Sequence, residues 1–127
     1  MGDTPLFHYQ ASSVKLHQIT EDHSIVATLV RSKMIPPEAA ASHHLRFYLG
    51  CDKLPNDPQI YQLKLEPNDL LLLCSDGVNG LLELEDLERV MASIDLTLDS
   101  KADRLLQAAL DAETTDNQTL ILFRHEN

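Results

Sequence analysis

The stretch "LLLLCSDGVNGLLEL", Leu70 to Leu84, decides the fold of this chain, because an apolar run is followed at once by a serine, an aspartate and a glycine. A short continuous apolar run bounded by a turn signal is typical of a buried strand. The glycine permits a tight turn or a close approach that a side chain would block. The stretch therefore predicts a buried strand that places Asp76 at one end of a sheet. By itself, such an aspartate most often caps the next helix or closes a turn.

A second aspartate stands in a similar position near the end of the chain. The segment "TTDNQTLILFR" places Asp116 just before a strongly β-prone run, and there too a turn aspartate is the ordinary interpretation. If the two strands are neighbours, Asp76 and Asp116 converge at one rim of the sheet. Like charges held close together are unfavourable unless they are protonated or bridged by a cation. The oxygen ligands would suit Mg²⁺ or Mn²⁺.

The remaining patterns predict an α+β domain with antiparallel strands. "PLFHYQ" and "VKLHQIT" indicate a hairpin around residues 11–13, and "QIYQLKL" alternates like a half-buried strand that turns through "EPND" into the apolar run. Two amphipathic patterns predict helices packed on one face of the sheet. In the second half, the patterns predict strands Ile60 to Leu65, Leu70 to Cys74 and Thr119 to Phe123, and helices Leu84 to Ser93 and Ala102 to Ala112.

The first half carries weaker signals. "TEDHSIVATLVRSKMI" predicts a helix that ends before Pro36, and "PEAAAS" predicts a second short helix. Residues 43–58 read as a long loop. Neither a repeat nor a linker interrupts the pattern, so the chain is expected to be a single domain over residues 1–127.

Composition limits the partners and the compartment. Twenty acidic against ten basic residues give a net charge of −10, which disfavours nucleic acid as a ligand. The apolar runs are too short for a membrane-spanning helix, and the first residues lack the pattern of a signal peptide. Cys51 and Cys74 form no CxxC pair, which favours a reducing compartment. We therefore expect a cytoplasmic protein that contacts neither membrane nor nucleic acid.

Together the motifs resemble a known family. "LLLLCSDGVNGLLELEDLERVM", followed about thirty residues later by "TTDNQTLILF", is similar to the carboxy-terminal half of the metal-dependent type 2C serine/threonine phosphatases, the PPM family. "VKLHQITEDHSIVATLVRSKMIPPEAAASHHLRFYLG" resembles the segment upstream in that family, and "GDTPLFHY" resembles its "GDSR" strand. The likeness covers essentially the whole chain and implies a partial PPM-type β-sandwich with antiparallel strands and flanking helices.

The resemblance also implies a chemistry. Asp76 and Asp116 correspond to aspartates that hold the family's metal pair, Mg²⁺ or Mn²⁺, and Asp3 to one that helps hold a further, weaker metal. The metals position and deprotonate a water that attacks the phosphorus of a phosphoserine or phosphothreonine in a phosphoprotein substrate, without a phosphoenzyme. Residues 41–57 correspond to the flap beside the catalytic cleft. The supporting residues around the site are Ser75, Gly77 and Asn117.

Departures from the family pattern leave two functions open. The family's amino-terminal half, with its phosphate-binding arginine and its bridging "DGxGG" aspartate, does not precede the GDS-like motif here, and Gly80 stands where the family usually has an aspartate. The chain is therefore expected to bind metal weakly and to have little activity alone. It is either part of a phosphatase or an inactive pseudophosphatase or protein-binding module. Missing strands would uncover part of the sheet and favour self-association.

Overall fold

The structure, a computed structural model, describes residues 4–21, 50, 52 and 59–126. The chain divides into two compact units, residues 1–4 with 21–60 and residues 5–20 with 61–127. All described helices and strands belong to the second unit. Asp3, most of the flap and nearly all of the two helices predicted before residue 43 lie outside the described residues. That the whole chain is a single domain stays a prediction.

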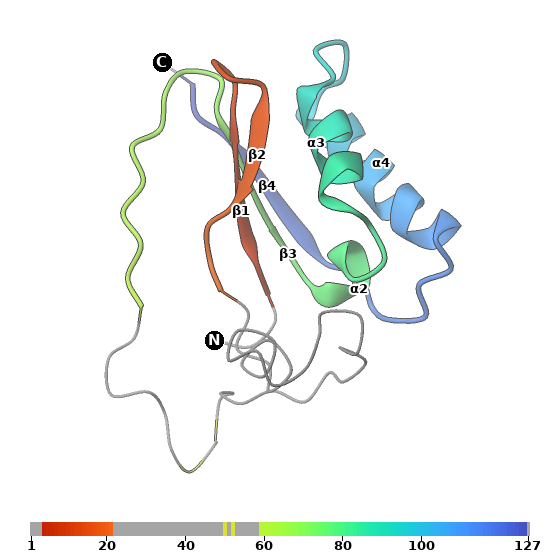
Figure 1. Cartoon of the computed structure of the whole chain (residues 1–127). Helices are drawn as coiled ribbons and strands as arrows, with labels where there is room; N and C mark the ends of the chain where they lie inside the picture. The colour runs from red at the N-terminus through yellow and green to blue at the C-terminus, as the bar shows by residue number, and fades with distance from the viewer. Residues whose placement is uncertain (1–3, 22–49, 51, 53–58, 127) are drawn as a thin grey trace. The chain divides into compact units, whose positions relative to one another are not determined.

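The described strands form one antiparallel sheet in the order β2-β1-β3-β4 (Figure 1). The predicted hairpin is present, with Tyr9 opposite Leu16. Its turn includes Val14, whose φ of 55° is unusual for a β-branched residue. The central strand, β3, is the apolar run before Asp76, and it pairs with β1 on one side and β4 on the other. The strand bounds are β1 Leu6–Gln10, β2 Lys15–Gln18, β3 Leu70–Cys74 and β4 Leu120–Arg124.

Three helices, α2, α3 and α4, pack on one face of this sheet (Figure 1). The two amphipathic helices lie where the sequence predicts them, and the short α2 follows β3 directly. α4 begins four residues earlier than predicted, because the Thr97 side chain accepts a hydrogen bond of 3.1 Å from the Ser100 amide and caps the helix there. The helix bounds are α2 Asp76–Asn79, α3 Leu84–Ala92 and α4 Leu98–Asp111.

The core lies between the sheet and the helices. In β3, alternate residues Leu70, Leu72 and Cys74 are buried, as expected when one face of a strand meets a hydrophobic layer. The register puts them on the same face as Tyr9 and Leu122. Helix residues complete this layer, namely Val78, Leu87, Met91 and Leu105. Burial of this layer is the main force that holds the helices on the sheet.

The other face of the sheet is also apolar near β4, yet it is exposed. Leu73 lies opposite Ile121, and Leu71 lies opposite Phe123. The exposed fractions of Leu73, Ile121 and Phe123 are 37%, 63% and 49%. We call these three residues the outer patch. Large apolar side chains gathered on one surface are characteristic of an interaction surface.

The predicted strand from Ile60 to Leu65 is wrong. In the part of the chain that the structure describes, this segment joins no sheet, and it runs as irregular chain into the turn before β3 (Figure 1). Leu63 is exposed, and so is Ile60. Alternation shows which side chains could be buried together, but a strand forms only where a neighbouring strand accepts its backbone hydrogen bonds. The turn itself is as predicted, with a hydrogen bond of 3.0 Å from the Asp69 amide to the Glu66 carbonyl.

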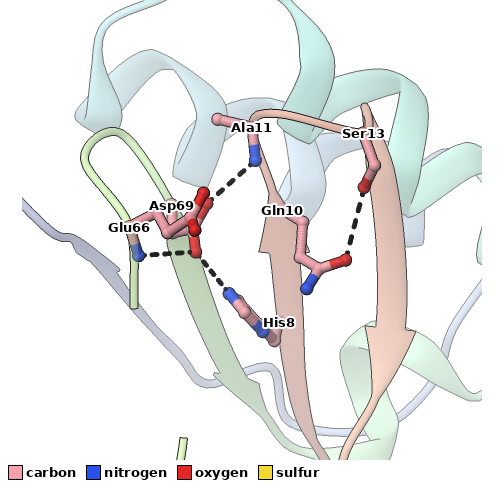
Figure 2. Close-up of polar contacts among 6 residues, drawn as sticks. All are labelled: His8, Gln10, Ala11, Ser13, Glu66 and Asp69. Carbon is pink, nitrogen blue, oxygen red and sulfur yellow. Dashed lines mark hydrogen bonds and ion pairs between the residues drawn. The ribbon is translucent and has the colours of Figure 1, made fainter. Parts of the chain in front are cut away.

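A buried polar cluster fixes the beginning of β3 (Figure 2). Asp69 Oδ2 lies 2.8 Å from His8 Nε2 and accepts from the Glu66 amide at 3.0 Å, while Oδ1 accepts from the Ala11 amide at 2.9 Å. Burial alone raises the pKa of Asp69, but the hydrogen bonds from Glu66, Ala11 and His8 outweigh it and lower the pKa below its usual value. The cluster therefore ties β3 to β1 and to the hairpin turn.

Lys101 closes the carboxy-terminal end of α3. Its buried Nζ donates to the carbonyls of Val90, Met91 and Ser93 at 3.0, 2.6 and 2.5 Å. These acceptors include carbonyls that the helix leaves without partners at its end. The pKa of Lys101 is lowered mainly by burial, which disfavours the charged amine, and to a smaller extent by repulsion from Arg124. The side chain thus joins α4 to the end of α3.

Candidate metal site

The ends of β3 and β4 bring together the two aspartates that the sequence singles out. The strands are antiparallel neighbours, and their last pair is Cys74 with Leu120. Asp76 follows the end of β3 and Asp116 precedes β4, so both residues belong to the same end of the sheet. The condition set by the sequence argument, that the two strands be neighbours, is therefore met.

Ser75 joins the two segments beyond the last strand pair. Its amide donates to the Thr119 carbonyl at 2.9 Å, its hydroxyl donates to the Asn117 carbonyl at 3.2 Å, and the same hydroxyl accepts from the Thr119 amide at 3.1 Å. The family resemblance implies supporting roles for Ser75 and Asn117, and the structure does bring these two residues together. It also adds Thr119, which only the pairing register could have revealed.

Gly77 lies directly against the same loop. A Cβ placed on it would stand 2.2 Å from the Asn117 carbonyl oxygen and 3.4 Å from the Asp116 carbonyl carbon. Real Cβ contacts are essentially never closer than 3.0 Å, so no side chain fits without moving this backbone. The glycine after Asp76 therefore serves a close approach of two backbones, as the sequence predicts.

Asp76 and Asp116 differ in their local settings. Asp76 is the first residue of α2, half-buried, and the capping position before it is Ser75. A carboxylate in the first turn is favoured by the partial positive charge of a helix amino terminus. Asp116 is exposed, and its Oδ1 accepts from the Asn117 amide at 2.7 Å. One carboxylate oxygen of Asp116 thus contacts the amide of the next residue in its own loop.

The donor chemistry at this end of the sheet fits a hard divalent cation. Carboxylate and carbonyl oxygens are the ligands that Mg²⁺ and Mn²⁺ prefer. Cys74 belongs to the buried core, where burial raises the pKa of its thiol to about 12 and its Sγ lies 3.7 Å from Asn79 Oδ1. Among the described residues, no group of three or more His, Cys, Asp or Glu side chains is placed to hold a metal. A cation bound at this end of the sheet would therefore need ligands beyond the described carboxylates.

Known proteins with similar sequences and structures are phosphatases. No family model matches the chain. It is 34% identical over 116 residues to the serine/threonine phosphatase stp of Listeria monocytogenes, a match that covers 87% of this chain and 45% of that protein. It is 31% identical over 109 residues to the protein phosphatase PhpP of Streptococcus pneumoniae, covering 84% of this chain and 44% of that protein. The chain thus spans about half the length of these relatives.

Solved structures agree with this match. The structure of the S. agalactiae serine/threonine phosphatase superposes with a TM-score of 0.86 at 27% identity, covering 99% of this chain and 52% of that one. The catalytic domain of the phosphatase PstP, in complex with two manganese ions, gives a TM-score of 0.79 at 28% identity over 96% of this chain and 50% of that one. The resemblance to PPM phosphatases and the partial α+β fold are thereby confirmed. No helix within the described ranges is long and apolar enough to cross a membrane.

Proposed function

We propose that this chain, a relative of the type 2C (PPM) serine/threonine phosphatases that spans about half their length, forms the metal-binding carboxy-terminal part of such an enzyme. The observation that carries the proposal is the contact between the two motifs. Ser75 and Gly77, on either side of Asp76, both contact Asn117, which follows Asp116. Turn aspartates on unrelated surfaces would not require so close a contact between the two segments.

In this proposal each residue has a defined task. Asp76 and Asp116 bind Mg²⁺ or Mn²⁺ through carboxylate oxygens, and Asp3 contributes to a further site. The bound metals would supply a nucleophilic water at neutral pH and neutralise phosphate charge. The substrate is a protein that carries phosphoserine or phosphothreonine. Ser75, Gly77 and Asn117 hold the two carboxylate-bearing segments together.

Metal binding tests the site directly. We expect titration calorimetry with Mn²⁺ to show weak binding to the wild-type chain, because the described carboxylates make an incomplete octahedral site. Asp76→Ala and Asp116→Ala should each reduce it. Asp103→Ala, which removes an exposed carboxylate on α4, is the matched control and should bind like the wild type. Equal binding by the wild type and Asp76→Ala would show that Asp76 is only a helix and turn residue.

Activity distinguishes the phosphatase from its alternative. Activation of water and charge neutralisation each lower a barrier by several kcal/mol, and about 1.4 kcal/mol corresponds to a factor of ten in rate. The chain alone should therefore hydrolyse a phosphothreonine peptide orders of magnitude more slowly than a complete relative. Mixed with the part of the L. monocytogenes phosphatase that it does not match, it should gain Mn²⁺-dependent activity that Asp76→Ala abolishes. Association without activity would favour a pseudophosphatase or binding module.

The outer patch supports a further part of this proposal, self-association. Leu73, Ile121 and Phe123 form an apolar surface on the two strands, and β4 is an edge of the described sheet. We propose that a second copy covers the patch. A net charge of −10 on each copy opposes the contact, so added salt should strengthen it. Sedimentation should show a concentration-dependent dimer that Ile121→Lys weakens, whereas a monomer at high concentration and high salt would refute it.

A further inference from the structure

The inference concerns how the two aspartates are kept in place, and it rests on the proposed metal role of Asp76 and Asp116. We infer that Ser75 and Gly77 form a clamp on the Asn117 carbonyl that sets the separation of the two aspartates for a divalent cation. Both are positioning residues, since in the structure they contact the backbone of the loop before β4. The clamp consists of the Ser75 hydroxyl, the bare α-carbon of Gly77 and the Asn117 carbonyl.

The first observation is the direction in which the Ser75 hydroxyl makes its hydrogen bonds. Ser75 occupies the position before α2, where a serine side chain ordinarily accepts a hydrogen bond from an amide of its own helix. Here its side chain makes no such bond. It reaches across to the neighbouring segment, donating to the Asn117 carbonyl and accepting from the Thr119 amide. The serine is therefore used to join two segments and not to cap the helix.

The second observation is the close approach at Gly77. The Asn117 carbonyl that accepts from Ser75 is the same group that a Cβ on Gly77 would strike at 2.2 Å. If that carbonyl moved away from Gly77, it would lose its hydrogen bond from the Ser75 hydroxyl. A hydrogen bond thus pulls the loop inward, and the absence of a side chain at Gly77 leaves room for it.

The third observation is where the aspartates sit relative to these contacts. Asp76 stands between Ser75 and Gly77, the two residues that contact Asn117, and Asp116 is the immediate neighbour of Asn117. Their backbones are thereby fixed to each other on both sides of Asp76. Mg²⁺ demands near-ideal octahedral geometry, so a fixed separation of the ligating residues favours its binding.

Hydrogen exchange tests the clamp without metal. In Ser75→Ala the Thr119 amide loses its acceptor, so its exchange measured by NMR should become faster. The amide of residue 75, which donates to the Thr119 carbonyl through the backbone alone, should keep its protection and serves as an internal control. Unchanged protection of Thr119 would overturn the clamp, whatever the metal result.

Metal affinity tests its purpose. Groups that orient metal ligands typically contribute 10–100-fold to affinity, so Ser75→Ala and Gly77→Ala should each weaken Mn²⁺ binding at least about tenfold in calorimetry. Ser75→Thr keeps a hydroxyl and should bind like the wild type, which separates positioning from a general loss of folding. Ser93→Ala removes another serine hydroxyl bonded to a backbone carbonyl, at the end of α3, and should have no effect.

The outcomes separate the clamp from the proposed function. If the wild type binds Mn²⁺ through Asp76 but Ser75→Ala binds equally well, the clamp is refuted and the metal site stands. If the wild type does not bind Mn²⁺ at all, the proposed metal site fails in the chain as it stands, and so does the purpose assigned to the clamp. Ser75→Thr retains the hydroxyl. If it nevertheless bound Mn²⁺ as weakly as Ser75→Ala does, the positioning role of the hydroxyl would also be refuted.

Discussion

Asp69→Asn should strongly destabilise the fold. The carboxylate of Asp69 is buried and accepts three hydrogen bonds, two at Oδ2 and one at Oδ1. An asparagine has a single oxygen. If that oxygen takes the Oδ2 position, its amide nitrogen faces the Ala11 amide, and two donors point at each other. If it takes the Oδ1 position, the Glu66 amide and His8 lose their acceptor.

The magnitude follows from these contacts. Hydrogen bonds to a charged group contribute about 1.5–3 kcal/mol each and those to a neutral group about 0.5–1.5 kcal/mol, so one lost bond and two weakened bonds amount to about 3 kcal/mol or more. This is a large part of the roughly 5–15 kcal/mol that stabilises a typical domain. Urea denaturation followed by circular dichroism at pH 7 measures it. Asp103→Asn on the exposed face of α4 should change the stability very little.

The pH dependence supplies the refutation. Because the pKa of Asp69 is lowered in the folded protein, its stabilisation is full above the unfolded value of about 3.9 and is lost as the pH falls through the folded value. The difference between wild type and Asp69→Asn should therefore shrink as the pH falls below about 4. Stability of Asp69→Asn within about 0.5 kcal/mol of wild type at pH 7 would refute the reasoning, since ordinary surface substitutions stay within that range. A difference independent of pH would refute it too.

Three further predictions concern single side chains. Lys101→Met should destabilise by about 1–3 kcal/mol in urea denaturation, because three carbonyls at the end of α3 lose their donor, whereas exposed Lys64→Met should be neutral. Val14→Gly should raise the melting temperature, since a left-handed conformation costs a side-chain-bearing residue about 1–2 kcal/mol; a lower melting temperature would contradict the strain. In a Cys51→Ser background, the Cys74 thiol, with a pKa of about 12, should react with Ellman's reagent at pH 8 only on unfolding, and rapid native labelling would contradict its burial.

The elements of the second half were readable from the sequence where local physics decides them. The run from Leu70 to Cys74 is continuous and apolar, and it becomes the central strand. The amphipathic patterns predicted α3 and α4, because a 3.6-residue period places apolar side chains on one face whatever the partner. The predicted start of α4 lies four residues too late, because the helix begins at its Thr97 cap and not at the first strongly apolar face.

Pairing between distant segments could not be read in this way. Residues 60–65 alternate as a strand should, yet in the described chain no sheet includes them, because strand formation depends on a neighbour and not on the pattern alone. The buried contact of His8 with Asp69 was also missed. It joins residues 61 positions apart, and a histidine on a short strand carries no local signal for its partner.

The candidate site divides along the same line. The sequence itself singled out Asp76, Gly77 and Asp116, because an aspartate and a glycine after an apolar run, and a second aspartate before a β-prone run, are recognisable local patterns. Their role toward a metal came from the family resemblance. Only the tertiary structure decided that these segments touch, that the Ser75 hydroxyl serves the opposite loop and that Gly77 leaves room for the Asn117 carbonyl. The reason is that the pairing of β3 with β4 is a non-local contact, settled by burial of the shared core and by backbone hydrogen bonds that no single segment contains.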